Sequence, residues 1–217
     1  MFNGAAFIEG AIKNILSQTL QPYEIIVVDD GSTDNSAEIV KRFPQVTYLY
    51  QNNQGPSAAR NAGISAAKGD LISFLDCDDV YPANKLQLLH EHFLAATDLS
   101  AVIGTFQYFF DTANDKLGYS EIHEGNIANH VLVGAGMFKK SLFSVIGNFD
   151  EKLLYSEDFD WYQRLYASKE KFIKIDDCCL LYRRHANNYT NSKKGVQKGF
   201  LQALHKAMAL KKEQQNG

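Results

Sequence analysis

The chain has 217 residues, of which 45% are hydrophobic and 22% charged, and its formal net charge is −3. These values are typical of a folded domain and exclude disorder of the whole chain. The small acidic net charge argues against bulk electrostatic binding to nucleic acid, so we expect no nucleic-acid partner. No apolar run approaches about 18 residues, so we expect no membrane span. The first residues also lack the basic start and the long apolar segment of a signal peptide.

The predicted helices and strands alternate along the first half of the chain. Residues 6–20 carry apolar side chains at helical spacing, and residues 23–30 form a short apolar run that ends in acid, as buried strands do. The patterns predict helices over 6–20, 32–43, 56–69, 82–96, 157–168 and 196–215, and strands over 23–30, 46–51, 71–76, 101–110 and 171–185. This alternation predicts an α/β fold with a mostly parallel sheet and helices on both faces. Residues 111–130 show no period and are expected to form a long loop.

The three cysteines, Cys77, Cys178 and Cys179, are an odd number, and two of them are adjacent. This is a poor disulfide framework, and the spacing fits no zinc site. A reducing cytoplasm is therefore the expected setting.

Two predicted strands end in carboxylates, at Asp29–Asp30 and at Asp76, Asp78 and Asp79. In an open α/β sheet, ligands bind outside the carboxyl ends of the strands, so both clusters should face one crevice. A divalent cation would relieve their repulsion, and a diphosphate group is the simplest reason for such a cation to be present. A single acid at this place more often caps the next turn, but two clusters favour a site. Because no glycine-rich phosphate loop occurs, the metal would hold the phosphates.

Four stretches occur in order and carry a resemblance to a known family: "SQTLQPYEIIVVDDGSTDNS", "NQGPSAARNAGISAAKGDLISFLDCDD", "GNFDEKLLYSEDFDWYQRL" and "YRRH". Together they resemble the signatures of the inverting family 2 glycosyltransferases, which have the GT-A fold. The resemblance runs from Asn3 to about His185. It implies a nucleotide-sugar donor, Mn²⁺ or Mg²⁺ as cofactor, and a central sheet flanked by helices with a helix at the C-terminus.

The resemblance implies roles for five residues at the nucleotide. Asp30 would contact the base or the ribose, and Arg60 would lie against the nucleobase or the diphosphate. Asp76 would face the ribose and Asp78 the metal, as the two acids of the family's Asp-x-Asp. His185 would approach the metal or the diphosphate from the C-terminal side. The ordinary alternatives are that Arg60 pairs with a nearby acid on a solvated helix and that His185 is a surface histidine.

For catalysis, the resemblance matches Asp158 with the family's general base. An inverting transfer is an in-line displacement in which the acceptor hydroxyl loses its proton, so a carboxylate is needed on that face. Glu157 precedes Asp158 and is grouped with the nucleotide-binding residues. Asp158 could also be an ordinary acid at a helix N-terminus. Trp161 and Tyr162, on the same helix, are expected in the core, although one of them could line the acceptor groove.

We therefore expect a metal-dependent inverting glycosyltransferase that moves a sugar from a nucleotide-sugar to a glycan or a lipid-linked acceptor. The expected donor is a UDP-sugar. The alternatives are a catalytically impaired nucleotide-sugar-binding protein, a sugar-1-phosphate nucleotidyltransferase, and a protein-interaction domain. The expected division is a nucleotide-sugar-binding half over 1–110, an acceptor-side half over 111–190 and a terminal helix over 191–217. Residues 131–140 would lie near the acceptor, and 111–130 could act as a lid. The terminal helix is expected to pack on its own domain, with a partner or a membrane surface as alternatives.

Members of the family open with an apolar strand in the middle of the sheet, and residues 2–4 match only the end of the turn that follows this strand. We therefore expect the chain to be truncated before this point, with weak or no transferase activity and lowered stability. The strands over 23–30 and 71–76 would then face a gap with unpaired backbone groups. The alternative is that these two strands pair directly and reshape the crevice.

Overall fold

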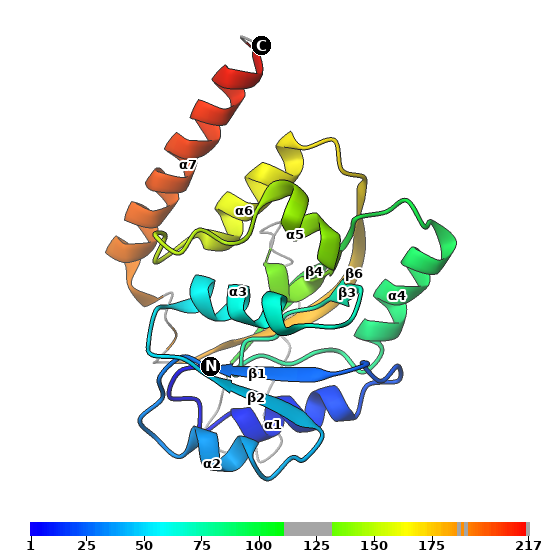
Figure 1. The fold of residues 1–217 in the computed structure, drawn as a ribbon, viewed down its shortest axis with the longest axis vertical. Coiled ribbons are helices and arrows are strands. Elements are labelled where there is room, and N and C mark those ends of the chain that lie inside the picture. Colours follow the sequence, from blue (N-terminus) through cyan, green and yellow to red (C-terminus); the bar gives the residue numbers. More distant parts are fainter. Residues whose placement is uncertain (111–131, 186–187, 189–190, 216–217) are drawn as a thin grey trace.

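The computed structural model describes residues 1–110, 132–185, 188 and 191–215 (Figure 1). The helices are α1 Ile8–Leu16, α2 Ser36–Val40, α3 Pro56–Ala66, α4 Lys85–Ala95, the 3₁₀ helix η1 Val133–Ala135, α5 Lys140–Ile146, α6 Glu157–Ala167 and α7 Lys193–Gln215. The strands are β1 Ile25–Asp29, β2 Val46–Tyr50, β3 Leu71–Ile72, β4 Ala101–Phe110, β5 Gly136–Lys139 and β6 Phe172–Arg184. All the predicted elements are present, several of them shorter than expected.

The strands form two sheets, and the larger one is mixed. β1 and β2 pair in parallel, and the second sheet has the order β3-β5-β4-β6. β4 and β6 are parallel, but β5 runs antiparallel to both of its neighbours. The sequence analysis did not predict β5, and its insertion corrects the expectation of a mostly parallel sheet. In Figure 1, α1 and α2 cover one side of the β1–β2 sheet and α3 covers the other.

Two predicted elements are shorter than their sequence patterns. The helix expected over 32–43 is limited to α2, because Asp34 accepts hydrogen bonds from the backbone N–H groups of Ser36 and Ala5 and so holds a turn ahead of the helix. The strand expected over 71–76 is limited to β3, which pairs only with β5 within the described residues.

A gap separates β1 from β3. No described backbone pairing joins these strands, so the direct pairing considered above does not occur. The Met1 amine instead donates to the Val28 carbonyl at 2.9 Å, and the Asp30 N–H donates to the Met1 carbonyl at 2.8 Å. These two bonds are the start of a parallel ladder along β1. Beyond them lies a largely apolar cavity of about 530 Å³, lined by residues that include Ile26, Val28 and Leu71.

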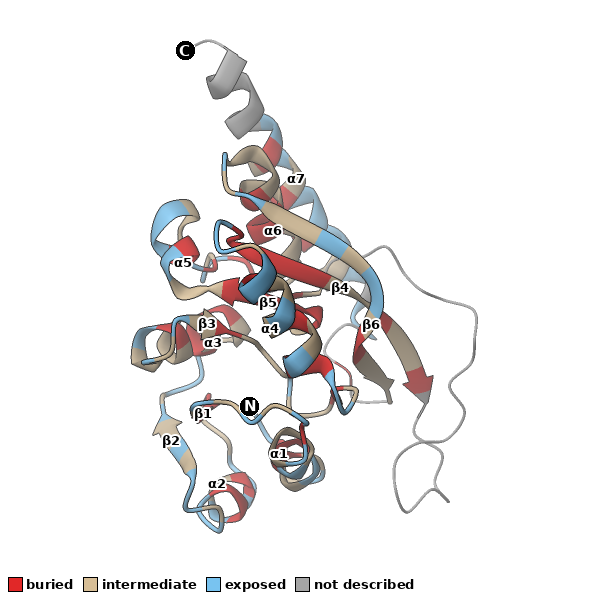
Figure 2. Cartoon of the chain, turned by 90° about the vertical axis from the view of Figure 1, so that its right-hand side faces the viewer, coloured by how far each residue is buried: buried red, intermediate tan, exposed pale blue. Residues whose placement is uncertain are grey.

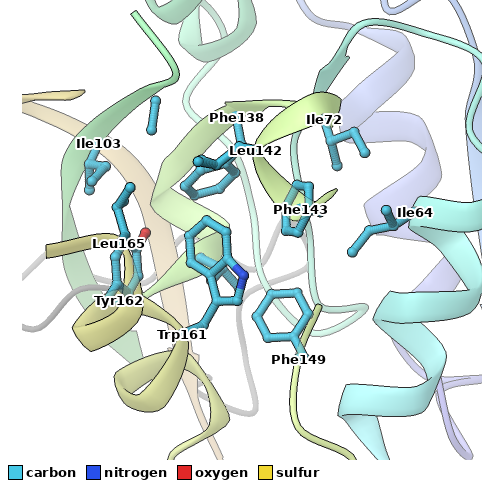
Figure 3. Close-up of a cluster of buried hydrophobic side chains, with 12 residues drawn as sticks. Ile64, Ile72, Ile103, Phe138, Leu142, Phe143, Phe149, Trp161, Tyr162 and Leu165 are labelled. Atoms are coloured by element: carbon cyan, nitrogen blue, oxygen red, sulfur yellow. The ribbon is translucent and has the colours of Figure 1, made fainter. Parts of the chain in front are cut away.

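One core cluster lies between the larger sheet and helices α5 and α6, and Figure 2 shows buried positions on β4, β5 and α6. Trp161 and Tyr162 of α6 are almost fully buried, which confirms the prediction that they belong to the core. The Trp161 ring packs against Phe143 and Phe149 with centroids at 5.0 and 5.7 Å (Figure 3). This packing fixes α6, and therefore the acidic residues at its N-terminus, against the sheet.

α7 packs on α6 through polar and aromatic contacts. The Lys206 ammonium lies 2.9 Å from Asp160 and 2.5 Å from Asp150, and the rings of Phe200 and Phe159 are 4.9 Å apart. The predicted packing of the terminal helix on its own domain is therefore confirmed where the structure describes its side chains. Among the described residues, no helix combines the length and the hydrophobicity that crossing a membrane requires. The proposed boundaries at 110 and 190 stay predictions, and the suggested lid over 111–130 lies outside the described residues.

Candidate functional site

Asp30 ends β1 and holds the loop that leads into α3. Its carboxylate accepts hydrogen bonds from the Gln51 side chain at 2.7 Å, the Gln54 N–H at 2.9 Å and the Gly55 N–H at 2.8 Å. Gly55 has a φ of 92°, which favours glycine, and Pro56 then opens the helix. In this structure Asp30 therefore orders the start of α3, and its contact with a nucleotide stays a prediction.

Arg60, one turn into α3, is the centre of an acidic cluster. Its Nη1 atom lies 2.8 Å from Glu157 Oε1 and 3.1 Å from Asp158 Oδ1, and its Nη2 atom lies 3.2 Å from Asp76 Oδ2. The guanidinium carbon is 5.5 Å from the centroid of the Phe149 ring. The Arg60 side chain is 11% exposed, and Glu157 and Asp158 are 14% and 16% exposed, so these two pairs are screened less by water than surface ion pairs are. Asp76 is 56% exposed, so its pair with Arg60 is open to solvent. Arg60 is thus a largely buried residue with three acidic partners, not a solvated one.

Asp158 lies in the first turn of α6, after Ser156, which has a left-handed backbone with φ of 63°. Its Oδ1 atom faces Arg60, and its Oδ2 atom accepts a hydrogen bond from the Val133 N–H at 3.1 Å. Burial raises the pKa of Asp158 to about 7; Arg60 and the Val133 N–H oppose this rise, whereas the Glu157 carboxylate adds to it. A carboxylate with a pKa near neutral is a stronger base than an exposed one and still ionises at physiological pH.

Asp78 and His185 form a second group beside the first. His185 Nε2 lies 3.1 Å from Asp78 Oδ2, and the Asn188 amide reaches the same oxygen at 3.5 Å. The His185 ring is 4.9 Å from the Phe7 ring and its side chain is 14% exposed, so it is not an ordinary surface histidine. Burial and the neighbouring Asp76 charge raise the pKa of Asp78, while His185 opposes that rise.

The remaining acids of the two clusters are held by protein donors. Asp29 accepts hydrogen bonds from the Ser32 N–H at 2.9 Å and the Tyr48 hydroxyl at 2.7 Å. Asp79 is 4% exposed and accepts from the Arg183 N–H at 2.9 Å, which fastens the end of β6 to the turn after β3. The interpretation of such acids as turn and cap residues therefore holds for Asp29 and Asp79. Asp76 and Asp78 instead contact Arg60 and His185, so they belong to the two groups described above.

The donor set around Asp78 fits a divalent cation that is shared with phosphates. Among the described residues, no group of three or more His, Cys, Asp and Glu side chains could hold a metal ion alone. Asp78 and His185 supply one carboxylate and one imidazole, and Mn²⁺ accepts both types. Magnesium-type sites commonly combine one or two carboxylates with substrate phosphates. These residues fit a metal that arrives with a diphosphate.

The structure thus brings four of the predicted residues, Arg60, Asp76, Glu157 and Asp158, into one network. Asp78 and His185 form the adjoining pair, and Asp30 belongs to neither. A pocket of about 160 Å³ is lined by residues that include Arg60, Asp76 and Val28.

Sequence reasoning missed several supporting residues. The Val133 N–H contacts Asp158, and the Asn188 amide contacts both Asp78 and the Arg183 carbonyl, the latter at 2.9 Å. A backbone donor leaves no signature in the sequence. An asparagine three residues after His185 is also too common in loops to stand out.

The sequence of the chain matches a known protein family and named proteins. A profile of Glycosyl transferase family 2 matches residues 1–190. The glycosyltransferase GlyG of Streptococcus pneumoniae serotype 4 is 32% identical over 213 residues, which cover 87% of this chain and 70% of GlyG.

Two solved structures share the fold at low sequence identity. The mannosyltransferase PcManGT from Pyrobaculum calidifontis, in complex with GDP-Man and Mn²⁺, has a TM-score of 0.74 and 19% identity over 96% of this chain. TarS 1-349 of S. aureus, in complex with UDP-GlcNAc, has a TM-score of 0.70 and 19% identity over 88% of this chain. This chain spans 62% and 59% of those two structures. The likeness shows that the chain has the GT-A fold.

Proposed function

We propose that this chain, a glycosyltransferase that belongs to glycosyl transferase family 2, transfers a sugar from a UDP-sugar to a glycan or lipid-linked saccharide with inversion at the anomeric carbon. The observation that carries the proposal is the Arg60 network. It joins Asp76 to Asp158, which is largely buried, has a raised pKa and is held by a backbone donor. Perturbed carboxylates of this kind gather at catalytic sites.

Asp158 would act as the general base. In an in-line displacement, the acceptor hydroxyl attacks the anomeric carbon and passes its proton to a carboxylate on that face. A correctly placed base typically contributes about 10²–10⁴-fold to the rate. Arg60 and the Val133 N–H hold the two oxygens of Asp158 from different sides. The carboxylate is thus oriented before the acceptor arrives, which limits the loss of entropy on reaching the reactive geometry.

Arg60 would also have a role in binding the donor. Its guanidinium is a planar fork that suits phosphates as well as carboxylates. A donor diphosphate would compete with Asp76, Glu157 and Asp158 for this fork, so donor binding would loosen the contact of Arg60 with the base.

Mn²⁺ or Mg²⁺, when bound with the donor, would neutralise the charge that develops on the departing diphosphate. Asp78 and His185 would hold it, because their Oδ2 and Nε2 atoms converge. Burial and the neighbouring Asp76 raise the pKa of Asp78, so its ionised form is poorly compensated by the protein and a cation at this place would stabilise it.

The donor is proposed from the relatives and the acceptor from the family. One structural neighbour binds UDP-GlcNAc and another binds GDP-Man with Mn²⁺. Phe200, Leu201 and Met208 of α7 are exposed apolar side chains. They support a proposal that the protein works at the cytoplasmic face of a membrane and is attached peripherally, which would suit a lipid-linked acceptor.

A thermal-shift panel of nucleotide-sugars, with and without Mn²⁺, tests the function. A ligand at about 100 times its Kd adds about 2.7 kcal/mol of stability, which is easily measured. We expect a UDP-sugar to stabilise the protein, and more strongly with Mn²⁺. Transfer to a saccharide acceptor is then assayed with the best donor. Donor binding without any turnover would favour the impaired binding protein, and no nucleotide or metal response would contradict the proposal.

A further inference from the structure

Lys85, the first residue of α4, is a fully buried lysine outside the site described above. Its ammonium lies 3.6 Å from the centroid of the Tyr81 ring. Burying an ammonium is costly unless acceptors surround it, and an apolar side chain of the same length would avoid that cost. The groups that accept hydrogen bonds from Lys85 should therefore explain why a lysine is buried here.

Lys85 holds the backbone of η1 and of the residue that follows it. Its Nζ atom donates to the carbonyls of Gly134 at 3.1 Å and Gly136 at 3.3 Å, and to the Ser73 hydroxyl at 2.5 Å. Ser73 in turn donates to the Gly136 carbonyl at 2.6 Å. One buried side chain thus connects α4, the segment after β3 and the 3₁₀ turn.

The other side of the same turn contacts α6. The Val133 N–H donates to Asp158 Oδ2 at 3.1 Å, and the Tyr162 hydroxyl donates to the Leu132 carbonyl at 3.4 Å. Lys85 and Asp158 do not touch, but each is bonded to one of two consecutive residues, Gly134 and Val133. The position of the Val133 N–H therefore depends on what holds the Gly134 carbonyl.

We propose that Lys85 is a positioning residue for Asp158, because its hydrogen bonds to Gly134 and Gly136 keep the Val133 N–H on the Asp158 carboxylate. The catalytic meaning of this inference rests on the proposed function, in which Asp158 is the base. The structural part of the inference, that Lys85 positions the Asp158 carboxyl, does not rest on that function, because the pKa of this carboxyl can be measured without any substrate.

The expected consequence follows from the surroundings of Asp158. The groups that face it are Arg60 from α3, Asp76 after β3, Glu157 and Tyr162 from α6, and the Val133 N–H. A hydrogen bond to the charged form of a carboxyl lowers its pKa. Without Lys85, the turn loosens, the Val133 bond weakens, and the pKa of Asp158 rises. A rise of about one unit corresponds to the loss of one hydrogen bond to a charged group.

The test compares Lys85→Met, which keeps the length of the side chain, with the wild-type protein. Burial lowers the pKa of Lys85 to about 7, in the range of Asp158 itself. The Asp158 carboxyl is therefore followed directly, by a carboxyl-carbon NMR titration assigned with Asp158→Asn. We expect its pKa to rise by about one unit in Lys85→Met. Leu89→Ala, on the same buried face of α4, is the control that lowers stability and leaves this pKa unchanged.

Activity gives a second readout. A rise of the pKa from about 7 to about 8 lowers kcat at pH 7 about fivefold, and activity returns to near the wild-type value at pH 9. The donor KM is unchanged. Plain loss of structure would lower kcat at both pH values.

Val133→Pro keeps the inference testable if Lys85→Met does not fold. It removes the donor itself at the first position of η1, where proline is tolerated, and Leu132 before it has the extended backbone that proline requires. We expect the same rise in the pKa of Asp158, and no further rise when both substitutions are combined.

The outcomes separate the inference from the proposed function. An unchanged Asp158 pKa in Lys85→Met, or in Val133→Pro if only that variant folds, overturns the inference even if the enzyme transfers sugar as proposed. An active Asp158→Asn variant instead removes Asp158 as the base, while the titration still decides whether Lys85 positions the carboxyl.

Discussion

The Arg60 guanidinium lies 3.1 Å from the Asp158 carboxylate, although the two residues are 98 positions apart in the chain. This contact joins α3 to the start of α6. It brings the side expected to bind nucleotide next to the side expected to bind acceptor. It also places a positive charge on the proposed base before any substrate is present.

Replacement of Asp158 by Asn should lower kcat at least 100-fold and leave the donor KM unchanged, because the amide keeps the shape but accepts no proton. Steady-state kinetics with the best donor measure both quantities. Glu157→Gln keeps the base and should lower kcat less than Asp158→Asn does. If kcat survives in Asp158→Asn and only KM rises, Asp158 binds donor and another group is the base.

In the wild type, kcat/KM should rise with pH to about 7 and then level off, because the base must be ionised.

Replacement of Arg60 by Met should destabilise the protein in a pH-dependent way. Without the guanidinium, the pKa of the largely buried Asp158 rises further. A carboxyl whose pKa is higher in the folded than in the unfolded protein lowers the free energy of unfolding as the pH rises from about 4, the unfolded pKa, through the folded pKa. We expect a loss of about 3 kcal/mol at pH 8 and a smaller loss at pH 5. Urea unfolding at the two pH values measures this, with exposed Arg42→Met as the control. A pH-independent loss would contradict the electrostatic explanation.

Replacement of Asp78 by Ala should abolish the part of UDP binding that depends on Mn²⁺, without unfolding the protein. Removing one carboxylate next to Asp76 relieves repulsion, which offsets the loss of the His185 contact. Calorimetry with and without Mn²⁺ measures the effect. Asp98→Ala, at an exposed acid paired with Lys171, should leave the metal dependence unchanged. An unaltered metal dependence in Asp78→Ala would remove this residue from the ligand set.

Addition of five β-branched apolar residues before Met1 should stabilise the protein. Met1 already makes the first two bonds of a parallel ladder with β1, and a strand in line with it would enter the apolar cavity between β1 and β3. Each buried Val or Ile contributes about 1.5–3 kcal/mol before the cost of ordering. We expect the melting temperature to rise by about 5 °C or more. A Gly/Ser extension of equal length is the control, and equal melting temperatures for the two extensions would show that the cavity does not take a strand.

The sequence predicted most elements in their order, although not β5 and α5, and it named the candidate site residues. The short apolar run before Asp30 predicted a strand that exists, because such a run records which side chains leave water. Proline at the start and glycine at the end of 56–69 predicted a helix that also exists, because these residues favour opposite ends of a helix. The resemblance named Arg60, Asp76, Asp78, Glu157, Asp158 and His185, and the structure brings these into two adjoining groups.

By itself, the sequence determined the fold class, the presence of most elements and the chemistry available at the strand ends, since these depend on local patterns and residue types. Only the tertiary structure decided which acids hold turns and which join the candidate site. Asp29 and Asp79 are taken up by donors far along the chain, and Arg60 gathers three acids from distant segments. The tertiary structure also buried Lys85 beside η1 and, within the described residues, left β1 and β3 without pairing to each other. The physical reason is that burial, and the charges and hydrogen bonds that compensate for it, arise between segments that the sequence does not place next to one another.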